Sequence, residues 1–185
     1  PYTKTLLGAD PTGTPDPIKA SAETVVKVDN LRVWFPITRG LIRRVVGHVK
    51  AVNDVKFDIH QGETLGVVGE SGSGKTTLAL AVMRLIKSEG PIVFMGENVD
   101  GLRNRKLKPL RRNMQMVFQD PYGSLSPRFT VEQIISEGLD VHGLNKGQDR
   151  RQVVMKILEE VGLQADMIDR YPHEFSGGQR QRIAI

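Results

Sequence analysis

Residues 65–77 constrain the fold of this 185-residue chain more than any other stretch, because an apolar run meets a glycine-rich turn there. The run from Leu65 to Val68 predicts a short buried strand that stops at Gly69. The spacing G-x-x-x-x-G-K-[ST] then follows, and its specified positions hold Gly69, Gly74, Lys75 and Thr76. This spacing between a strand and a helix is typical of a loop that binds the phosphates of a nucleoside triphosphate.

Each residue type in this loop has a physical reason to be there. Glycines let the backbone curl so that successive N–H groups point inward, and the helix opening near Lys75 directs its positive end to the same place. Lys75 can reach the β- and γ-phosphates, and the hydroxyl of Thr76 can bind Mg²⁺. The alternative is a glycine-rich turn that binds nothing. The residues expected to contact the nucleotide here are Gly69, Glu70, Ser71, Gly72, Ser73, Gly74, Lys75, Thr76 and Thr77.

The composition is that of a globular chain, with 39% apolar and 25% charged residues. The absence of cysteine excludes disulfides and thiolate metal sites, and the four histidines lack metal-ligand spacing. No apolar run approaches the ~20 residues of a membrane-spanning helix. The net charge is +5, and many basic residues lie within 103–112 without interleaved aromatic residues. An exposed helix face is therefore favoured there over a nucleic-acid surface.

The pattern along the chain predicts an antiparallel β region before the loop and mainly helices after it. Residues 1–22 carry four prolines and are predicted as tail and linker. Strands are predicted at 24–35, with a break at 29–30, and at 49–59, 92–95 and 114–118. A basic loop is predicted at 36–47. Helices are predicted at 78–86, 103–112, 131–141, 148–161 and 165–168.

A second motif narrows the candidates, because phosphate loops also occur in kinases, GTPases and helicases. In the run Phe175-Ser176-Gly177-Gly178-Gln179, the serine can cap a helix, and the glycines allow backbone N–H groups close to phosphate. The run resembles the LSGGQ signature of ATP-binding-cassette (ABC) ATPases, with Phe in place of Leu. The alternative is a plain Ser-Gly-Gly helix start. The resemblance implies that Ser176, Gly177, Gly178 and Gln179 contact nucleotide held by a partner cassette.

The same resemblance assigns a role to Gln119, which ends the apolar run 114–118. It looks like the glutamine of the family's Q-loop, which implies contact with Mg²⁺ and the attacking water, and a catalytic role together with Lys75. An alternative makes Asp120 the metal-binding acid of a Walker B strand. That alternative ranks lower, because Gln119 separates Asp120 from the apolar run.

An aromatic side chain upstream of the loop is expected to stack on adenine, because a ring face binds any base without requiring hydrogen bonds. Phe35 lies where the family pattern places this residue, four positions after Leu31, and Trp34 is the second choice. The alternative for both rings is ordinary packing within the strand region.

Longer segments resemble the ATPases of oligopeptide and dipeptide importers in particular. Residues 119–128, QDPYGSLSPR, are similar to their QDPxxSLNPR segment, with Ser126 where Asn is usual. Residues 170–175, RYPHEF, are similar to the lead-in of their signature motif. Residues 1–11 resemble the closing segment of the same family. A domain end before a domain start predicts a parent chain with two tandem cassettes, as in importers of the microcin C type.

The resemblance implies an α/β fold with a P-loop NTPase core of the ABC ATPase type. This core would carry an N-terminal antiparallel β subdomain and an inserted α-helical subdomain, and it would be incomplete at the C-terminus. The expected divisions are 1–22 (tail of a preceding cassette and linker), 23–118 (nucleotide-binding core with the β subdomain), 119–175 (Q-loop and helical subdomain) and 176–185 (signature motif and start of its helix).

The resemblance also implies a function: an ATP-binding subunit that powers the import of peptides or related substrates, with ATP and Mg²⁺ as cofactors. The expected partners are a second cassette in the same chain or another, transmembrane permease subunits and, indirectly, an extracytoplasmic substrate-binding protein. No nucleic acid partner is expected. The expected location is the cytoplasmic face of the cell membrane, as a peripheral protein. A soluble ABC ATPase that acts on nucleic acid or ribosomes is the alternative.

The 185 residues contain no run of four apolar residues followed by Asp-Glu, so a Walker B strand and its catalytic glutamate are missing from them, as is the switch histidine. We therefore expect the chain to bind ATP without hydrolysing it at a useful rate, and to be poorly stable alone. The segment from Ser176 is also predicted to be too short to form a helix by propensity.

Overall fold

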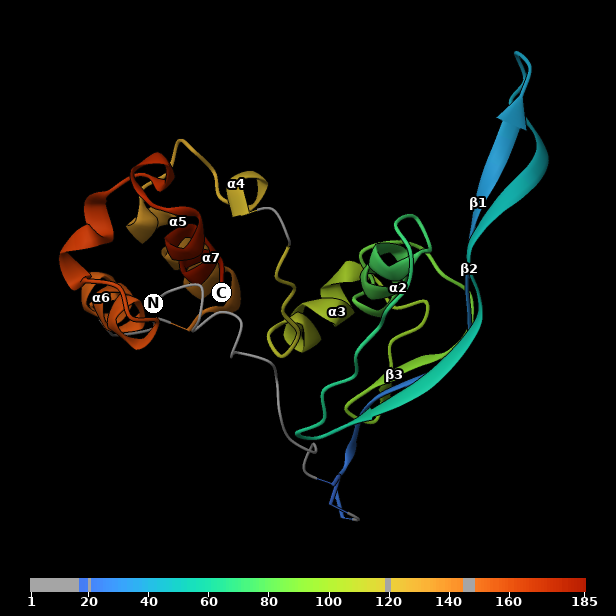
Figure 1. The fold of residues 1–185 in the computed structure, drawn as a ribbon, viewed down its shortest axis with the longest axis horizontal. Coiled ribbons are helices and arrows are strands. Elements are labelled where there is room, and N and C mark those ends of the chain that lie inside the picture. Colours follow the sequence, from blue (N-terminus) through green and yellow to red (C-terminus); the bar gives the residue numbers. More distant parts are fainter. Residues whose placement is uncertain (1–16, 20, 119–120, 145–148) are drawn as a thin grey trace, which may run out of the picture. The chain divides into compact units, whose positions relative to one another are not determined.

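The structure is a computed structural model that describes residues 17–19, 21–118, 121–144 and 149–185. The chain divides into two compact units, Pro1–Gly101 and Leu102–Ile185 (Figure 1), and each is described by itself. No helix among the described residues is long and apolar enough to cross a membrane.

The first unit is built on a four-stranded antiparallel sheet with the order β2-β1-β3-β4. The strands are β1 (Thr24–Arg39), β2 (Arg44–His60), β3 (Ile92–Phe94) and β4 (Glu97–Asn98). The predicted break at 29–30 is a bulge: the register shifts between Val28 and Leu31, and Asn30 has a φ of 47°. The bulge restores the alternation, so that Val28, Leu31 and Val33 are all buried.

The prediction of a basic loop at 36–47 was wrong. The strands β1 and β2 continue through this stretch as a paired hairpin, with Ile37 opposite Gly47 and Arg39 opposite Arg44. Only residues 40–43 form the turn, where the N–H of Arg43 donates to the carbonyl of Gly40 at 3.1 Å. Basic side chains do not prevent pairing on an exposed ribbon, because the ladder uses backbone groups.

Among the described residues of this unit, one helix, α2 (Lys75–Val82), follows the glycine-rich turn and contacts β1 and β2. It is shorter than the predicted 78–86. The predicted strand Leu65–Val68 was also wrong: residues 63–70 form no regular structure, and Val68 is 93% exposed. A strand needs neighbouring strands for its backbone hydrogen bonds, and none lies beside this segment among the described residues.

The second unit is helical and surrounds its own apolar core. Its elements are α3 (Asn104–Arg111), α4 (Pro121–Ser124), α5 (Val131–His142), α6 (Arg150–Glu160), the 3₁₀ turns η1 (Ala165–Asp169) and η2 (Pro172–Glu174), and α7 (Gly177–Ala184). The core consists of Leu125, Val131, Val154, Leu158, Leu163, Ile168, Phe175 and Ile183. The helices predicted at 103–112, 131–141, 148–161 and 165–168 are confirmed to within a few residues. The strand predicted at 114–118 was wrong, because this segment forms no regular structure.

Helix α7 forms although its sequence was predicted to be too short for a helix. A capping box closes its first turn, and Ile183 is buried in the core. Packing and capping therefore supply the stability that propensity alone does not.

Arg151 joins three elements of the second unit on the surface. Its guanidinium, on α6, donates to Glu132 of α5 at 3.0 Å and to Asp169 of η1 at 2.9 Å. The hydrogen bond from Arg151 lowers the pKa of the Asp169 carboxyl below its usual value. The carboxylate form of Asp169 is thus favoured in the folded unit, so this contribution is present at neutral pH and is lost as the pH falls through the lowered pKa.

Leu158→Ala is expected to destabilise the chain by about 2–5 kcal/mol, because it leaves a cavity in the core of the second unit. Leu158 is fully buried there. The measurement is the urea midpoint of helical circular dichroism. Glu159→Ala, at the neighbouring exposed position, is the control and should change stability by no more than about 0.5 kcal/mol. Equal midpoints for the two variants would contradict this core assignment.

Candidate nucleotide-binding site

The turn at 69–74 passes very close to strand β2. Gly74 has a φ of 95° and ends the turn as the residue that precedes α2. A Cβ at Gly74 would lie 2.2 Å from the carbonyl oxygen of Ala51. Both the backbone conformation and this close approach therefore require glycine, and they fix where α2 begins relative to the sheet.

The backbone N–H groups of this turn are mostly left free. The N–H of Ser73 donates to the carbonyl of Glu70 at 3.2 Å. Within the described parts of the chain, those of Gly72, Gly74, Lys75 and Thr76 donate to no backbone carbonyl. The first turn of α2 contains no acidic residue. Free donors and the positive end of the helix dipole therefore coincide, which suits an anion.

The side chain of Lys75 folds back over the same turn. Its Nζ donates to the carbonyl oxygens of Gly69 at 2.8 Å and Glu70 at 2.7 Å. These bonds hold a positive charge beside the free N–H groups. A polyphosphate would thus meet both donors and a cation, the combination that phosphate groups prefer.

The hydroxyl of Thr76 lies on the exposed first turn of α2, where it could bind a metal ion carried by the nucleotide. Elsewhere in the described ranges, no group of three or more His, Asp or Glu side chains is placed to hold a metal. The donor set therefore fits Mg²⁺ bound mainly through phosphate oxygens, with one protein hydroxyl.

Glu63 closes the turn that leads from β2 toward the loop. Its carboxylate accepts from the backbone N–H of His60 at 2.7 Å, and its distance to Nδ1 of His60 is 3.0 Å. The backbone hydrogen bond is the main cause of a lowered pKa for Glu63.

Of the two aromatic candidates, Phe35 lies on the face of the sheet that meets the loop. Val33 pairs with Val52, whose side chain is 3.9 Å from the place of a Cβ on Gly74. Alternation along β1 puts Phe35 on the same face as Val33, and Phe35 is 44% exposed. Phe35 thus lies on this face two residues beyond Val33, with its side chain partly exposed.

Trp34 points to the opposite face and is already engaged. Its indole N–H donates to Asn53 at 3.1 Å, and Nζ of Lys50 lies 4.5 Å from its ring centroid. A cation above the ring and a hydrogen bond at its edge hold Trp34 in place. This arrangement makes Trp34 the weaker candidate for adenine.

The signature-like run begins α7 in the second unit. Ser176 accepts from the N–H of Gln179 at 3.4 Å, and the side chain of Gln179 accepts from the N–H of Ser176 at 2.9 Å. The preceding Phe175 is buried in the core, and Arg180 donates to its carbonyl at 2.9 Å. These contacts hold the start of α7 in a fixed position within its unit.

Gly177 and Gly178 occupy the first turn of α7, where the chain itself does not need glycine. Added Cβ atoms would meet nothing within 4 Å at either position, and neither residue has a positive φ. Alanine would therefore fit and would favour the helix by about 1 kcal/mol. The two glycines leave a bare backbone surface at a helix N-terminus.

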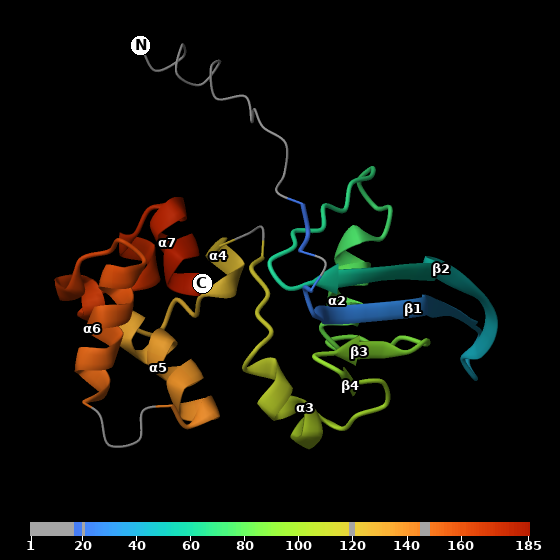
Figure 2. The ribbon, with the colours of Figure 1, turned by 90° about the horizontal axis from the view of Figure 1, so that it is seen from below.

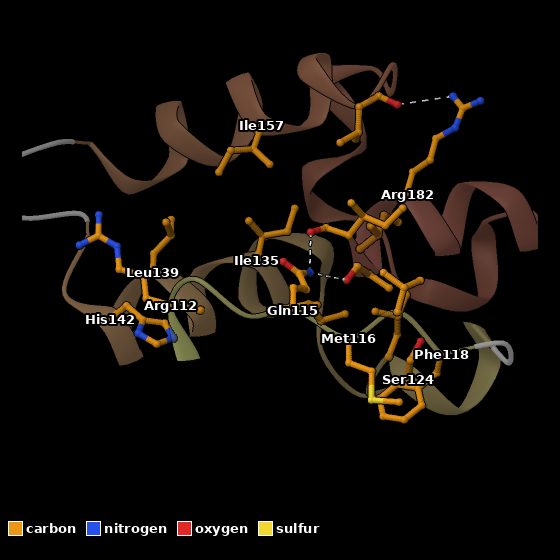
Figure 3. A pocket seen from close by; sticks show the side chains of 18 of the residues that line it. Arg112, Gln115, Met116, Phe118, Ser124, Ile135, Leu139, His142, Ile157 and Arg182 are labelled. Carbon is orange, nitrogen blue, oxygen red and sulfur yellow. Dashed lines mark hydrogen bonds between the residues drawn. The ribbon is translucent and has the colours of Figure 1, made fainter. Parts of the chain in front are cut away.

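Segment 114–118 lines a hollow of about 930 Å³ in the second unit (Figure 3). Mostly apolar side chains line it, including Met116, Ile135 and Leu139. The amide of Gln115 donates to the carbonyls at the end of α7, on Ala184 at 3.3 Å and Ile185 at 2.7 Å. Arg111, Arg112 and Arg182 also line the hollow, and Arg182 donates to the carbonyl oxygens of Val161 at 3.5 Å and Gly162 at 3.4 Å.

Gln119 and Asp120, the remaining candidates, lie outside the described residues, as do the tail residues 1–11. The loop residues 69–77 and Phe35 all belong to the first unit, whereas residues 176–179 belong to the second. Sequence reasoning missed Ala51, whose carbonyl the loop approaches. No sequence signal could have identified it, because every residue carries a carbonyl.

The family model for ABC transporters matches residues 52–185, and the chain therefore belongs to the ABC transporter family. It is 56% identical over 185 residues to the peptidoglycan transport ATP-binding protein YejF of Agrobacterium fabrum. This match covers the whole chain and 34% of that protein. It is 48% identical over 168 residues to the oligopeptide transport ATP-binding protein AppF of Bacillus subtilis. This match covers 90% of the chain and 51% of that protein. The chain thus spans about a third to a half of the length of these curated relatives.

A solved structure has the same fold. The ATP-binding cassette MJ0796, in a dimeric post-hydrolysis state bound to ADP and Pi, matches with a TM-score of 0.71 and 27% identity. The match covers 86% of this chain and 66% of that one. The expected class, a cassette ATPase with an antiparallel β subdomain and a helical part, is confirmed.

Gly74→Ala is expected to destabilise the first unit and abolish nucleotide binding, because its Cβ cannot coexist with the Ala51 carbonyl. The control is Gly62→Ala, since Gly62 also has a positive φ (78°) but a Cβ there would meet nothing within 4 Å. The control should lose about 1–2 kcal/mol and retain binding. Urea denaturation and titration with a fluorescent ATP analogue measure the two effects. Similar behaviour of the two variants would show that the close approach to β2 is not needed.

Proposed function

We propose that this chain is the nucleotide-binding part of an ATPase that powers the import of peptides or peptide-containing substrates. The observation that carries this proposal is the set of free N–H groups of Gly72, Gly74, Lys75 and Thr76, which lie beside the ammonium of Lys75. The names of YejF and AppF, which refer to peptidoglycan and oligopeptide transport, support the substrate class.

In this proposal, Lys75 exchanges the carbonyls of Gly69 and Glu70 for oxygens of the β- and γ-phosphates of ATP. The free N–H groups of the loop bind the same phosphates, and Thr76 binds the Mg²⁺ that the nucleotide carries. Phe35 stacks on the adenine. Gln119 contacts the metal and the attacking water, a role that rests on the sequence motif alone.

The second half of the site belongs to a partner cassette. The bare start of α7, from Ser176 to Gln179, covers the γ-phosphate of nucleotide held on the partner, and the partner does the same in return. The dimeric form of MJ0796 supports this arrangement. Closure would neutralise phosphate charge between two helix N-termini, and hydrolysis would release the dimer.

The remaining partners follow from the transport role. We place the cassette pair at the cytoplasmic face of the membrane, on permease subunits that receive substrate from an extracytoplasmic binding protein. We also propose a parent with two tandem cassettes, because residues 1–11 resemble the closing segment of a cassette. No observation favours the alternative of a nucleic-acid ATPase.

Lys75→Ala is expected to lower the affinity for ATP at least tenfold, because the β/γ-phosphate charge loses its counterion. Lys87→Ala, an exposed lysine beyond α2, is the control and should bind like the wild type. Titration of this chain with a fluorescent ATP analogue measures the effect. The unaltered chain should bind ATP with negligible turnover, and wild-type affinity in the Lys75 variant would refute the assignment.

Gly178→Ala is expected to stop ATP hydrolysis by the complete protein while leaving ATP binding intact, because a Cβ blocks the approach of phosphate to the start of α7. Gly138→Ala is the matched control: Gly138 lies within α5, and a Cβ there also meets nothing within 4 Å. Both variants should keep or gain helix stability. Measured ATPase activity should therefore fall only for Gly178→Ala, and normal activity in that variant would contradict the role in trans.

A further inference from the structure

The distal end of the β1–β2 hairpin is a separate feature that the nucleotide site does not use. Beyond Phe35, the two strands continue to a turn at 40–43. Figures 1 and 2 both show this end of the hairpin extending past β3 and α2. We call residues 37–46 the hairpin tip.

The hairpin tip exposes two large apolar side chains almost completely. Leu41 is 106% and Ile42 is 94% exposed, side by side at the apex of the turn. Ile37, Val45 and Val46 behind them are each about half exposed (47%, 51% and 57%). Single exposed apolar residues are common on proteins, but a contiguous group on a projecting turn indicates a binding surface.

Positive charge surrounds these apolar side chains without acidic neighbours. The sequence from Asn30 to Asn53 contains no Asp or Glu. Arg39, Arg43 and Arg44 flank the apex, and within the described residues none of them forms a salt bridge. Arg32, nearer the core, pairs with Asp54. Among the arginines of the β1–β2 hairpin, those without a salt bridge in the described structure therefore all lie at the tip.

We propose that the hairpin tip binds an anionic lipid surface, with Leu41 and Ile42 inserted at the boundary between headgroups and acyl chains. The three arginines then bind lipid phosphates, which suit the planar guanidinium group. The tip is a convex apex, so it offers no pocket for a partner's side chain. An anionic bilayer offers an apolar interior for Leu41 and Ile42 and negatively charged headgroups for the arginines. This inference does not depend on the proposed ATPase function.

The first test measures binding to protein-free vesicles by co-sedimentation. The chain should bind vesicles of phosphatidylglycerol with phosphatidylcholine, bind pure phosphatidylcholine far more weakly, and lose binding as salt is raised. A triple variant with Arg39→Gln, Arg43→Gln and Arg44→Gln should bind at least about tenfold more weakly. The matched control removes three charges that are also exposed, on α3, by Arg105→Gln, Lys106→Gln and Lys108→Gln, and should bind within about twofold of the wild type. Equal losses in the two triple variants would overturn the proposal, because binding would then reflect overall basicity.

The second test reports insertion directly and does not depend on comparing affinities. The chain has no cysteine, so Ile42→Cys can be labelled at one site with an environment-sensitive fluorophore. Its emission should shift to shorter wavelength on anionic vesicles, whereas the label on Glu97→Cys, an exposed position on β4, should not respond. An unchanged label at residue 42 would overturn the proposal. A shift with detergent-solubilised permease but none with vesicles would also overturn it, in favour of a protein contact.

Discussion

The close approach of Gly74 to the carbonyl of Ala51 is the constraint on which the nucleotide site depends. It places the end of the loop against β2 and so determines where α2 starts. Because α2 starts there, its first N–H groups and the ammonium of Lys75 lie at one place. Phe35 lies on the same face of the sheet, since the pairing of β1 with β2 places Val33 opposite Val52 beside the loop. One backbone contact thus links the loop proposed to bind phosphate with the ring proposed to bind the base.

The second unit presents its own functional surface in a different way. There Gly177 and Gly178 leave the backbone of the first turn of α7 without side chains, and neighbouring residues hold that turn in position. Phe175 is buried among the core residues of the helices, and Ser176 and Gln179 hold the first turn through reciprocal hydrogen bonds. The neighbouring residues thus hold the first turn of α7 in place, and the backbone of Gly177 and Gly178, which we propose contacts phosphate, needs no side chain to do so.

The candidate site could be identified from sequence, because it depends on residue types at fixed short spacings: Gly69 to Thr76 for the loop and Ser176 to Gln179 for α7. Amphipathic helices such as α5 and α6 were predicted for the same local reason. The wrong predictions concern strands, whose formation depends on neighbouring strands. Leu65–Val68 and Met114–Phe118 are apolar enough for buried strands, but a strand also needs neighbours, which a local pattern does not specify. Conversely, residues 36–47 were predicted as a basic loop, yet residues 36–39 pair with residues 44–48 across the hairpin.

The fold-back of Lys75 has a consequence for which ligands the loop accepts. The ammonium is held by two carbonyl oxygens, those of Gly69 and Glu70, before any ligand arrives. A ligand can bind this ammonium only if it displaces the two neutral carbonyl acceptors. Anionic phosphate oxygens bind an ammonium more strongly than carbonyls do, whereas the hydroxyls of a nucleoside do not. The hydrogen bonds of Lys75 therefore favour ligands with anionic oxygens. In the presence of an uncharged ligand, Lys75 stays bonded to the carbonyls of Gly69 and Glu70.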